Sequence, residues 1–215
     1  MKRAAAVMAL SALLAGCSLL GIRDEYEQPA YEVIEKVGED IELRRYAPRL
    51  AAEVVLEPKP GEDVCNTAFR ILFDYIAGAN RAKAEIAMTA PVAEGRPSQE
   101  IAMTTPVESA TGPDGRYSMR FFLPASFSEE TAPQPTDPRV RIVAVPAATV
   151  AVLRYTGSTG EEKAGEQRTR LLTTLGQAGW RPVGPPVAYF YDPPWTVPFL
   201  RRNEAAVRVE SQKTR

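Results

Sequence analysis

The chain has 215 residues, of which 45% are hydrophobic and 25% are charged, a composition typical of a globular protein that can bury a sizeable core. Its formal net charge of −1 leaves no excess of basic residues to neutralise phosphates, which argues against a nucleic acid partner. The chain contains no histidine, so the commonest metal ligand and the commonest general base of enzymes are both absent.

Residues 1–16 are typical of a bacterial signal peptide. Lys2 and Arg3 precede an apolar run that is too short to span a bilayer. The run ends in Leu14-Ala15-Gly16-Cys17, which resembles the bacterial lipobox, in which the cysteine is acylated and becomes the mature N-terminus. A plain secretory signal with an incidental cysteine is the alternative. We predict a leader over 1–16, and a lipidated Cys17 with a tether over 17–28 that anchors the protein to a membrane.

The resemblance to bacterial lipoproteins also implies a location. Ser18, rather than Asp, follows the cysteine, which favours the outer membrane, with the domain facing the periplasm. With Cys17 acylated, Cys65 is the one thiol left, so no intramolecular disulfide is expected even in an oxidising envelope.

Strands are predicted over 31–37, 41–46 and 51–56, and residues 41–46 alternate apolar with charged side chains, as in a half-exposed strand. A helix is predicted over 65–79, with Asp63 or Asn66 as its N-cap. The helix has an apolar stripe at i, i+3, i+4 and i+7 spacing, formed by Phe69, Leu72, Phe73 and Ile76. Such a stripe either packs into a core or lines a ligand groove. Ile71 and Tyr75 lie beside the stripe and favour the groove, because both sides of the helix cannot face inward equally.

A heptapeptide occurs twice, first over Ile86–Val92 and again, fifteen positions later, over Ile101–Val107. Ile, Met, Thr and Val suit a half-buried strand, and residues 93–98 read as a turn. We therefore predict that the two copies are the strands of one hairpin, with a threonine of each copy bonding across it.

More strands and a second helix are predicted in the rest of the chain. Strands are predicted over 117–123, 140–145, 148–155, 187–191 and 205–209, a helix over 162–175, and a proline-rich surface loop over 124–138. The order strand, strand, helix, strand, strand thus occurs twice. The prediction is one α+β domain over 29–210, made of two similar halves over about 31–123 and 139–209.

Three segments resemble the SOUL haem-binding protein family. They are the opening strand pair over 31–46, the helix and following strand over 69–92, and Tyr191-Asp192-Pro193-Pro194 with Arg201-Arg202-Asn203-Glu204-Ala205. The resemblance implies a distorted eight-stranded antiparallel β-barrel of two halves related by a pseudo-twofold axis, each with a flanking helix. It also implies binding of haem or a related tetrapyrrole, without a well-established reaction.

The family resemblance places the ligand on the first helix. It points to an apolar groove of Phe69, Leu72, Phe73 and Ile76, with Arg70 as a partner for the propionates. Some family members are thought to ligate iron through histidine, which this chain cannot do. Met88, Met103, Cys65 and Tyr75 are possible ligands in principle, and each is better explained as structural. We therefore expect no metal site, and a clamp on the ring face and propionates that also accepts metal-free porphyrin.

Three functions remain open. The first is a lipid-anchored envelope protein that binds a tetrapyrrole or another flat apolar ligand. The second is an envelope scaffold or stress-response lipoprotein without a haem role. The third is a carboxylate-dependent hydrolase, although the sequence has no serine or cysteine triad and no phosphate loop, so no enzyme is predicted. The motif Arg201-Arg202-Asn203-Glu204 could bind an anion, but holding the preceding proline-rich loop is the favoured interpretation.

Overall fold

The computed structural model describes residues 26–82, 98–193 and 195–212. The first half contains β1 (Tyr31–Val37), β2 (Ile41–Tyr46), β3 (Arg49–Leu56), α2 (Val64–Ile76), β4 (Asn80–Arg81), β5 (Val107–Thr111) and β6 (Tyr117–Phe122). The second half contains β7 (Gln134–Pro135), β8 (Val140–Val145), β9 (Ala148–Tyr155), α3 (Glu161–Gln177), β10 (Trp180–Phe190), the 3₁₀ helix η1 (Pro198–Leu200) and β11 (Asn203–Ser211). The predicted strands and helices over 31–56, 65–79 and 140–175 are confirmed to within a few residues.

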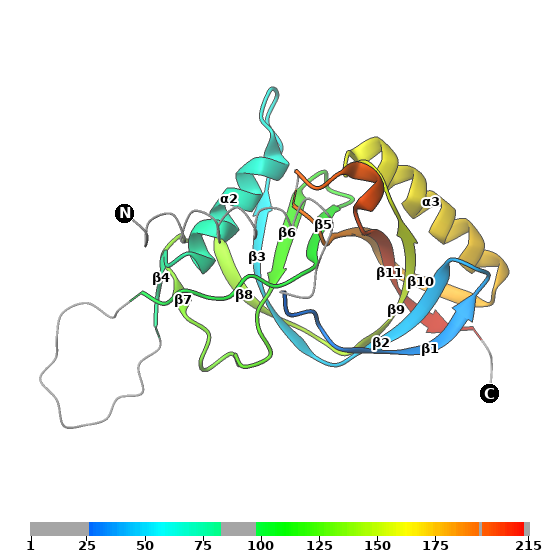
Figure 1. Cartoon of the computed structure of the whole chain (residues 1–215), viewed down its shortest axis with the longest axis horizontal. Helices are drawn as coiled ribbons and strands as arrows, with labels where there is room; N and C mark the ends of the chain where they lie inside the picture. The colour runs from blue at the N-terminus through cyan, green and yellow to red at the C-terminus, as the bar shows by residue number, and fades with distance from the viewer. Residues whose placement is uncertain (1–25, 83–97, 194, 213–215) are drawn as a thin grey trace, which may run out of the picture.

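Nine strands form one antiparallel sheet in the order β1-β2-β9-β11-β10-β5-β6-β3-β8, and β4 pairs with β7 in a separate sheet of two strands. The sheet is strongly curled, with both long helices on its outer side (Figure 1). The predicted α+β class is confirmed. The predicted closed barrel of eight strands is not found among the described residues, since the large sheet has nine strands, with β1 and β8 at its two ends.

One continuous ladder connects the halves. The pairing of β2 with β9 ends at Tyr46 opposite Ala148, and the pairing of β3 with β8 resumes in the same register at Arg49 opposite Val145. Each strand is interrupted there by two residues, one of them a proline, which cannot donate to the ladder. The rest of the pairing is repeated: β3 pairs with β6 and β6 with β5, while β9 pairs with β11 and β11 with β10.

Alternation along the strands separates three apolar cores. In β3, Ala52 and Val54 face α2, while Ala51 faces the opposite, inner side of the sheet. The second core lies between α3 and β1, β2, β9 and β11. The third lies on the inner side and includes Tyr46, Phe122, Val152, Tyr189 and Tyr191. Within the described ranges, no helix is both long and apolar enough to cross a bilayer.

The heptapeptide hairpin is not confirmed. The first copy, Ile86–Val92, lies outside the described residues. The second copy is not a strand, since only its last residue, Val107, belongs to β5. Thr104 instead bridges to Glu27, and its hydroxyl donates to the carbonyl of Phe122. The second copy is thus held by the N-terminal segment and by the end of β6.

Candidate functional site

Helix α2 begins at a capped terminus. The side chain of Asp63 accepts a hydrogen bond from the backbone N–H of Asn66 at 3.0 Å, so Asp63 and not Asn66 is the N-cap. The helix then packs on β3, β6 and β8. Its buried residues are Ala68, Ile71, Leu72, Tyr75 and Ile76. The side of α2 that faces the sheet is therefore centred between Ala68 and Leu72. The position of this side determines which predicted ligand residues reach the surface.

The structure divides the predicted groove. Leu72 and Ile76 are buried in the core under α2, whereas Phe69 is half-buried and Phe73 is 48% exposed. Arg70 is exposed on the same helix. Ile71 and Tyr75 also face the core, so the expectation that they lie on a separate flank from the packed side is wrong. The predicted residues that a ligand could touch are Phe69, Arg70 and Phe73.

An aromatic surface runs from the core to the outside of α2. The rings of Phe69 and Phe73 are stacked, with centroids 6.1 Å apart and planes 15° apart. Phe69 in turn contacts Phe121 of β6 edge-on, with centroids 5.3 Å apart. We call these three rings the aromatic ladder. Phe121 was not singled out from the sequence because its position in a buried strand indicated packing alone. Phe73 is the exposed ring of the ladder, and aromatic rings of this kind can stack on a flat ligand.

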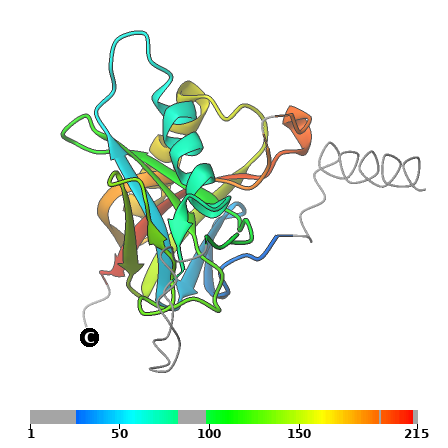
Figure 2. The ribbon, with the colours of Figure 1, turned by 90° about the vertical axis from the view of Figure 1, so that its left-hand side faces the viewer.

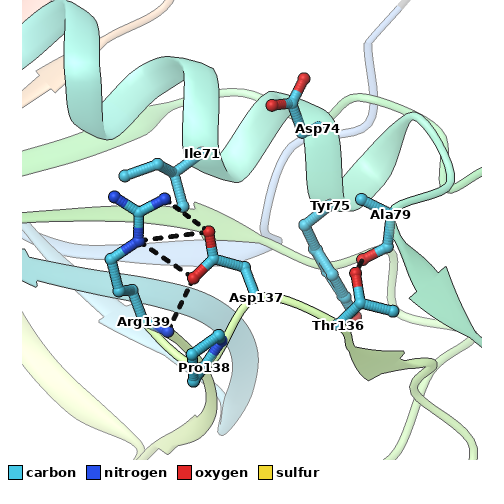
Figure 3. Close-up of a pocket in the computed structure, with 8 residues that line it drawn as sticks. All are labelled: Ile71, Asp74, Tyr75, Ala79, Thr136, Asp137, Pro138 and Arg139. Carbon is cyan, nitrogen blue, oxygen red and sulfur yellow. Dashed lines mark hydrogen bonds and ion pairs between the residues drawn. The ribbon is translucent and has the colours of Figure 1, made fainter.

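A pocket of about 470 Å³ lies on the opposite flank of α2, between the helix and residues 136–139 (Figure 3). Its lining residues are Ile71, Asp74, Tyr75, Ala79, Thr136, Asp137, Pro138 and Arg139. The hydroxyl of Thr136 donates to the carbonyl of Ala79 at 2.8 Å and ties the segment to the end of the helix. This pocket was missed, because its outer wall comes from the predicted surface loop and nothing local indicates that the loop returns to α2.

Most polar groups of this pocket are already paired. The guanidinium of Arg139 bonds the carboxylate of Asp137 at 2.6 to 3.2 Å, and this hydrogen bonding lowers the pKa of Asp137. The hydroxyl of Tyr75 donates to the carbonyl of Pro133 at 2.9 Å. Burial raises the pKa of Tyr75, so the phenol is neutral. The exposed carboxylate of Asp74 also lines the pocket, beside the paired Asp137 and Arg139, and the phenol of Tyr75 forms part of its wall.

The possible iron ligands are scattered. Met88 lies outside the described residues, and Met103 is half-buried against the core under α2. Cys65 is an exposed free thiol in the first turn of α2. Tyr75 is occupied and neutral, as described above. Among the residues that the structure describes, no group of three or more cysteine, aspartate or glutamate side chains is arranged to hold a metal ion.

The C-terminal motif builds a buried ionic cluster on the inner side of the sheet. Glu204 is fully buried and accepts hydrogen bonds from Arg44, Arg202 and Tyr191. Burial alone would raise the pKa of Glu204, but the two guanidinium groups and the phenol outweigh it and lower that pKa. The involvement of Arg44 was not predicted, because one arginine in an exposed-looking strand carries no signal for a partner near the other end of the chain.

The same motif also holds the segment before it, as the sequence analysis favoured. The guanidinium of Arg201 donates to the carbonyl of Thr196 at 2.8 Å, and the backbone N–H of Arg202 donates to Asp192 at 2.7 Å. A second ionic group on the inner side joins Arg120 to Glu53 and Glu108, each at 2.8 Å. These two carboxylates are bonded by one guanidinium, and neither is a free acid or base.

Comparisons with known proteins agree with the fold and identify a family. Residues 26–208 match the family described as SOUL heme-binding protein. Heme-binding protein 2 of Homo sapiens is 27% identical over 158 residues, which cover 71% of each chain. The structure of the EcmrR C-terminal domain superposes with a TM-score of 0.56 at 10% identity, covering 84% of this chain and 98% of that one. A hydrolase from Listeria innocua superposes with a TM-score of 0.54 at 14% identity, over 80% and 92%. At such low identity, these two likenesses concern the fold alone.

Proposed function

The chain belongs to the SOUL heme-binding protein family, and from this membership we propose that it binds haem or a related tetrapyrrole on α2. The ring stacks on the exposed face of Phe73 and is held by apolar contact and ion pairing, without a histidine ligand. The observation that carries the proposal is the aromatic ladder, in which the exposed ring of Phe73 stacks on Phe69, and Phe69 in turn packs on Phe121.

Two features of α2 support this placement. Phe73 is the one large hydrophobic residue of α2 that the described structure leaves exposed. A solvent-exposed phenyl ring fixed by stacking presents apolar area that a macrocycle would remove from water. Arg70 is exposed one turn earlier, and no carboxylate among the described residues pairs with it. Its guanidinium therefore suits a propionate group at the edge of the ring.

We propose further that the protein is a lipoprotein of the bacterial envelope. Its leader covers residues 1–16, and acyl chains on Cys17 hold it to the outer membrane on the periplasmic side. Its role there is to scavenge, store or buffer tetrapyrroles. Metabolic labelling with a fatty acid analogue tests the anchor: wild type should be labelled and Cys17→Ser should not.

A titration tests the binding proposal. Residues 18–215 are titrated with ferric haem and, separately, with metal-free protoporphyrin, and the Soret band is followed. The proposal predicts saturable one-to-one binding of both rings. Binding of ferric haem alone would indicate an axial ligand, and Met88, Met103 and Cys65 would be substituted in turn. Binding no tighter than to an unrelated protein of similar size would contradict the proposal.

An envelope scaffold without a haem role is the second candidate. It is supported by the burial of Leu72 and Ile76, because half of the predicted groove is committed to the core. The hydrolase has no such support. Glu53 and Glu108 are two carboxylates brought together by the fold, and both are bonded to Arg120.

A further inference from the structure

Two aromatic side chains project from the segment that joins β10 to β11. Trp195 is 65% exposed and Phe199 is 73% exposed, more than any other large hydrophobic residue among those described. They lie four positions apart, on either side of the start of η1 (Pro198–Leu200). Large apolar side chains grouped on one surface segment are typical of an interaction site.

The segment that carries them is firmly held. Thr196, next to Trp195, is fully buried, and its carbonyl accepts a hydrogen bond from Arg201 at 2.8 Å. The carbonyl of Pro198, next to Phe199, accepts from the backbone N–H of Gly157 at 2.9 Å. Backbone hydrogen bonds at Thr196 and Pro198 therefore hold the chain beside each exposed ring. The fold holds both aromatic side chains in solvent, so their exposure is not the result of a loosely attached loop.

This segment lies close to the point at which the N-terminal tether joins the domain. The guanidinium of Arg202 bonds the side chain of Gln28 at 3.4 Å. Figure 2 shows η1 and the beginning of the described chain on the same side of the molecule, at the right of the view. Cys17 precedes Gln28 by eleven positions. A fully extended stretch of that length spans at most about 40 Å, so a lipid on Cys17 keeps this side of the domain near the bilayer.

We propose that Trp195 and Phe199 insert into the lipid–water interface of the membrane to which Cys17 is anchored. This inference rests on the proposed lipid anchor. Tryptophan suits the interface because its ring is apolar while its indole N–H can still bond to water or headgroups. The acyl chains and the two rings then form two separate attachments. Attachment through Cys17 alone would leave the domain free to turn, whereas two attachments hold one side of it against the bilayer.

The chain provides its own matched control, since Trp180 and Trp195 are its two tryptophans. Trp180 lies at the start of β10, half-buried against the core under α3, with its indole N–H donating to Glu35 at 3.5 Å. The full-length lipidated protein is placed in vesicles of phosphatidylethanolamine and phosphatidylglycerol whose acyl chains are brominated. Tryptophan emission is compared with that in the same vesicles without bromine, for wild type, Trp180→Phe and Trp195→Phe.

The proposal predicts that Trp180→Phe, which reports on Trp195, is quenched at least twofold and emits at shorter wavelength than in solution. Trp195→Phe should be quenched little. If Trp180→Phe folds poorly, the quenching of Trp195 is obtained instead from the difference in emission between wild type and Trp195→Phe, both of which keep Trp180. Equal weak quenching of both tryptophans overturns the proposal. Emission from Trp195 that shifts with the surface density of protein, without quenching by lipid, also overturns it and indicates contact with a second copy.

Flotation of the vesicles distinguishes membrane docking by Trp195 and Phe199 from the lipid anchor on Cys17. Protein that floats with the vesicles while Trp195 remains unquenched leaves the anchor intact and contradicts membrane docking alone. Protein that does not float contradicts the anchor and the docking together. Neither result affects the haem titration, which reports on α2.

Discussion

The guanidinium of Arg44 makes two parallel hydrogen bonds to the carboxylate of Glu204, at 2.9 and 3.1 Å, across 160 positions of sequence. The side chains are 3% and 0% exposed. Arg44 lies on β2 and Glu204 on β11, and both strands pair with β9, so the ion pair spans the central strand of this half on its inner side. It connects the first strands of the domain to the C-terminal strand.

Removing the charge of Glu204 should destabilise the fold. Glu204→Gln removes the buried counter-charge of Arg44 and leaves only the partly exposed carboxylate of Glu42 beside its guanidinium. The expected loss is about 3–5 kcal/mol in the free energy of unfolding. The adjacent pair of Arg45 and Glu32 has the same 2.9 Å separation but is 60% and 67% exposed. Arg45→Met should therefore cost no more than about 1 kcal/mol. Urea unfolding measures both variants, and equal losses would contradict the account.

The same carboxylate should make stability depend on acid pH. The pKa of Glu204 is lowered from its ordinary value of 4.5 in the folded state, so its contribution is fully present above that value and is lost as pH falls through the folded-state pKa. Other carboxylates also respond to acid, and Glu204→Gln removes this one alone. The difference in unfolding free energy between wild type and Glu204→Gln should be constant above about pH 5 and should shrink below pH 4.5. A difference independent of pH down to pH 2 would show that the carboxylate is not the source.

The sequence predicted secondary structure well where the spacing of apolar residues matched one type of element. The alternation in 41–46 and the i, i+3, i+4 spacing from Phe69 locate β2 and α2. The second heptapeptide has strand-like residues as well, but the segment is irregular. The N–H of Thr105 donates to the carbonyl of Glu27, and the hydroxyl of Thr104 donates to the carbonyl of Phe122. Such contacts come from distant parts of the chain and leave no local pattern. The continuous register between the two halves is of the same kind and leaves no local pattern either. The expected eight-stranded barrel came from the family resemblance and not from the pattern of residues.

The candidate site was predictable in part. The sequence shows that Phe69, Leu72, Phe73 and Ile76 share a face of α2, but it does not show where the sheet lies around the helix. That direction buries Leu72 and leaves Phe73 exposed. The pocket beside Tyr75 and the pairing of Arg44 with Glu204 were out of reach for the same reason, since each joins segments that lie far apart in sequence.

The N-cap of α2 can be tested directly. Asp63→Ala removes the acceptor for the N–H of Asn66 and should lower the free energy of unfolding by about 1 kcal/mol. Asn66→Ala removes the other capping residue considered and should change stability by less than half as much. Thermal unfolding followed by circular dichroism measures both, and a larger loss in Asn66→Ala would contradict the assignment of the cap.

Adjacent buried threonines give a second matched pair. The hydroxyl of Thr104 donates to the carbonyl of Phe122, whereas the hydroxyl of Thr105 is buried without a partner in the described structure. Thr104→Val leaves that carbonyl unsatisfied and should cost about 1–3 kcal/mol. Thr105→Val replaces an unpaired hydroxyl by a methyl group and should be neutral or stabilising. Chemical denaturation measures the free energy of unfolding of both variants. A larger loss in Thr105→Val than in Thr104→Val would show that Thr104 does not hold this segment.

The most direct test of the account is the affinity of ferric haem for Phe73→Asp. The substitution places a charge on the exposed end of the aromatic ladder, where the predicted ring would stack. Asn66→Asp adds the same charge two turns earlier on the exposed side of α2, and Arg139→Ser opens the rim of the pocket on the other flank. The account predicts at least tenfold weaker binding in Phe73→Asp and near wild-type binding in the other two. Unchanged binding in Phe73→Asp together with a loss in Arg139→Ser would contradict it and place the ligand in the pocket.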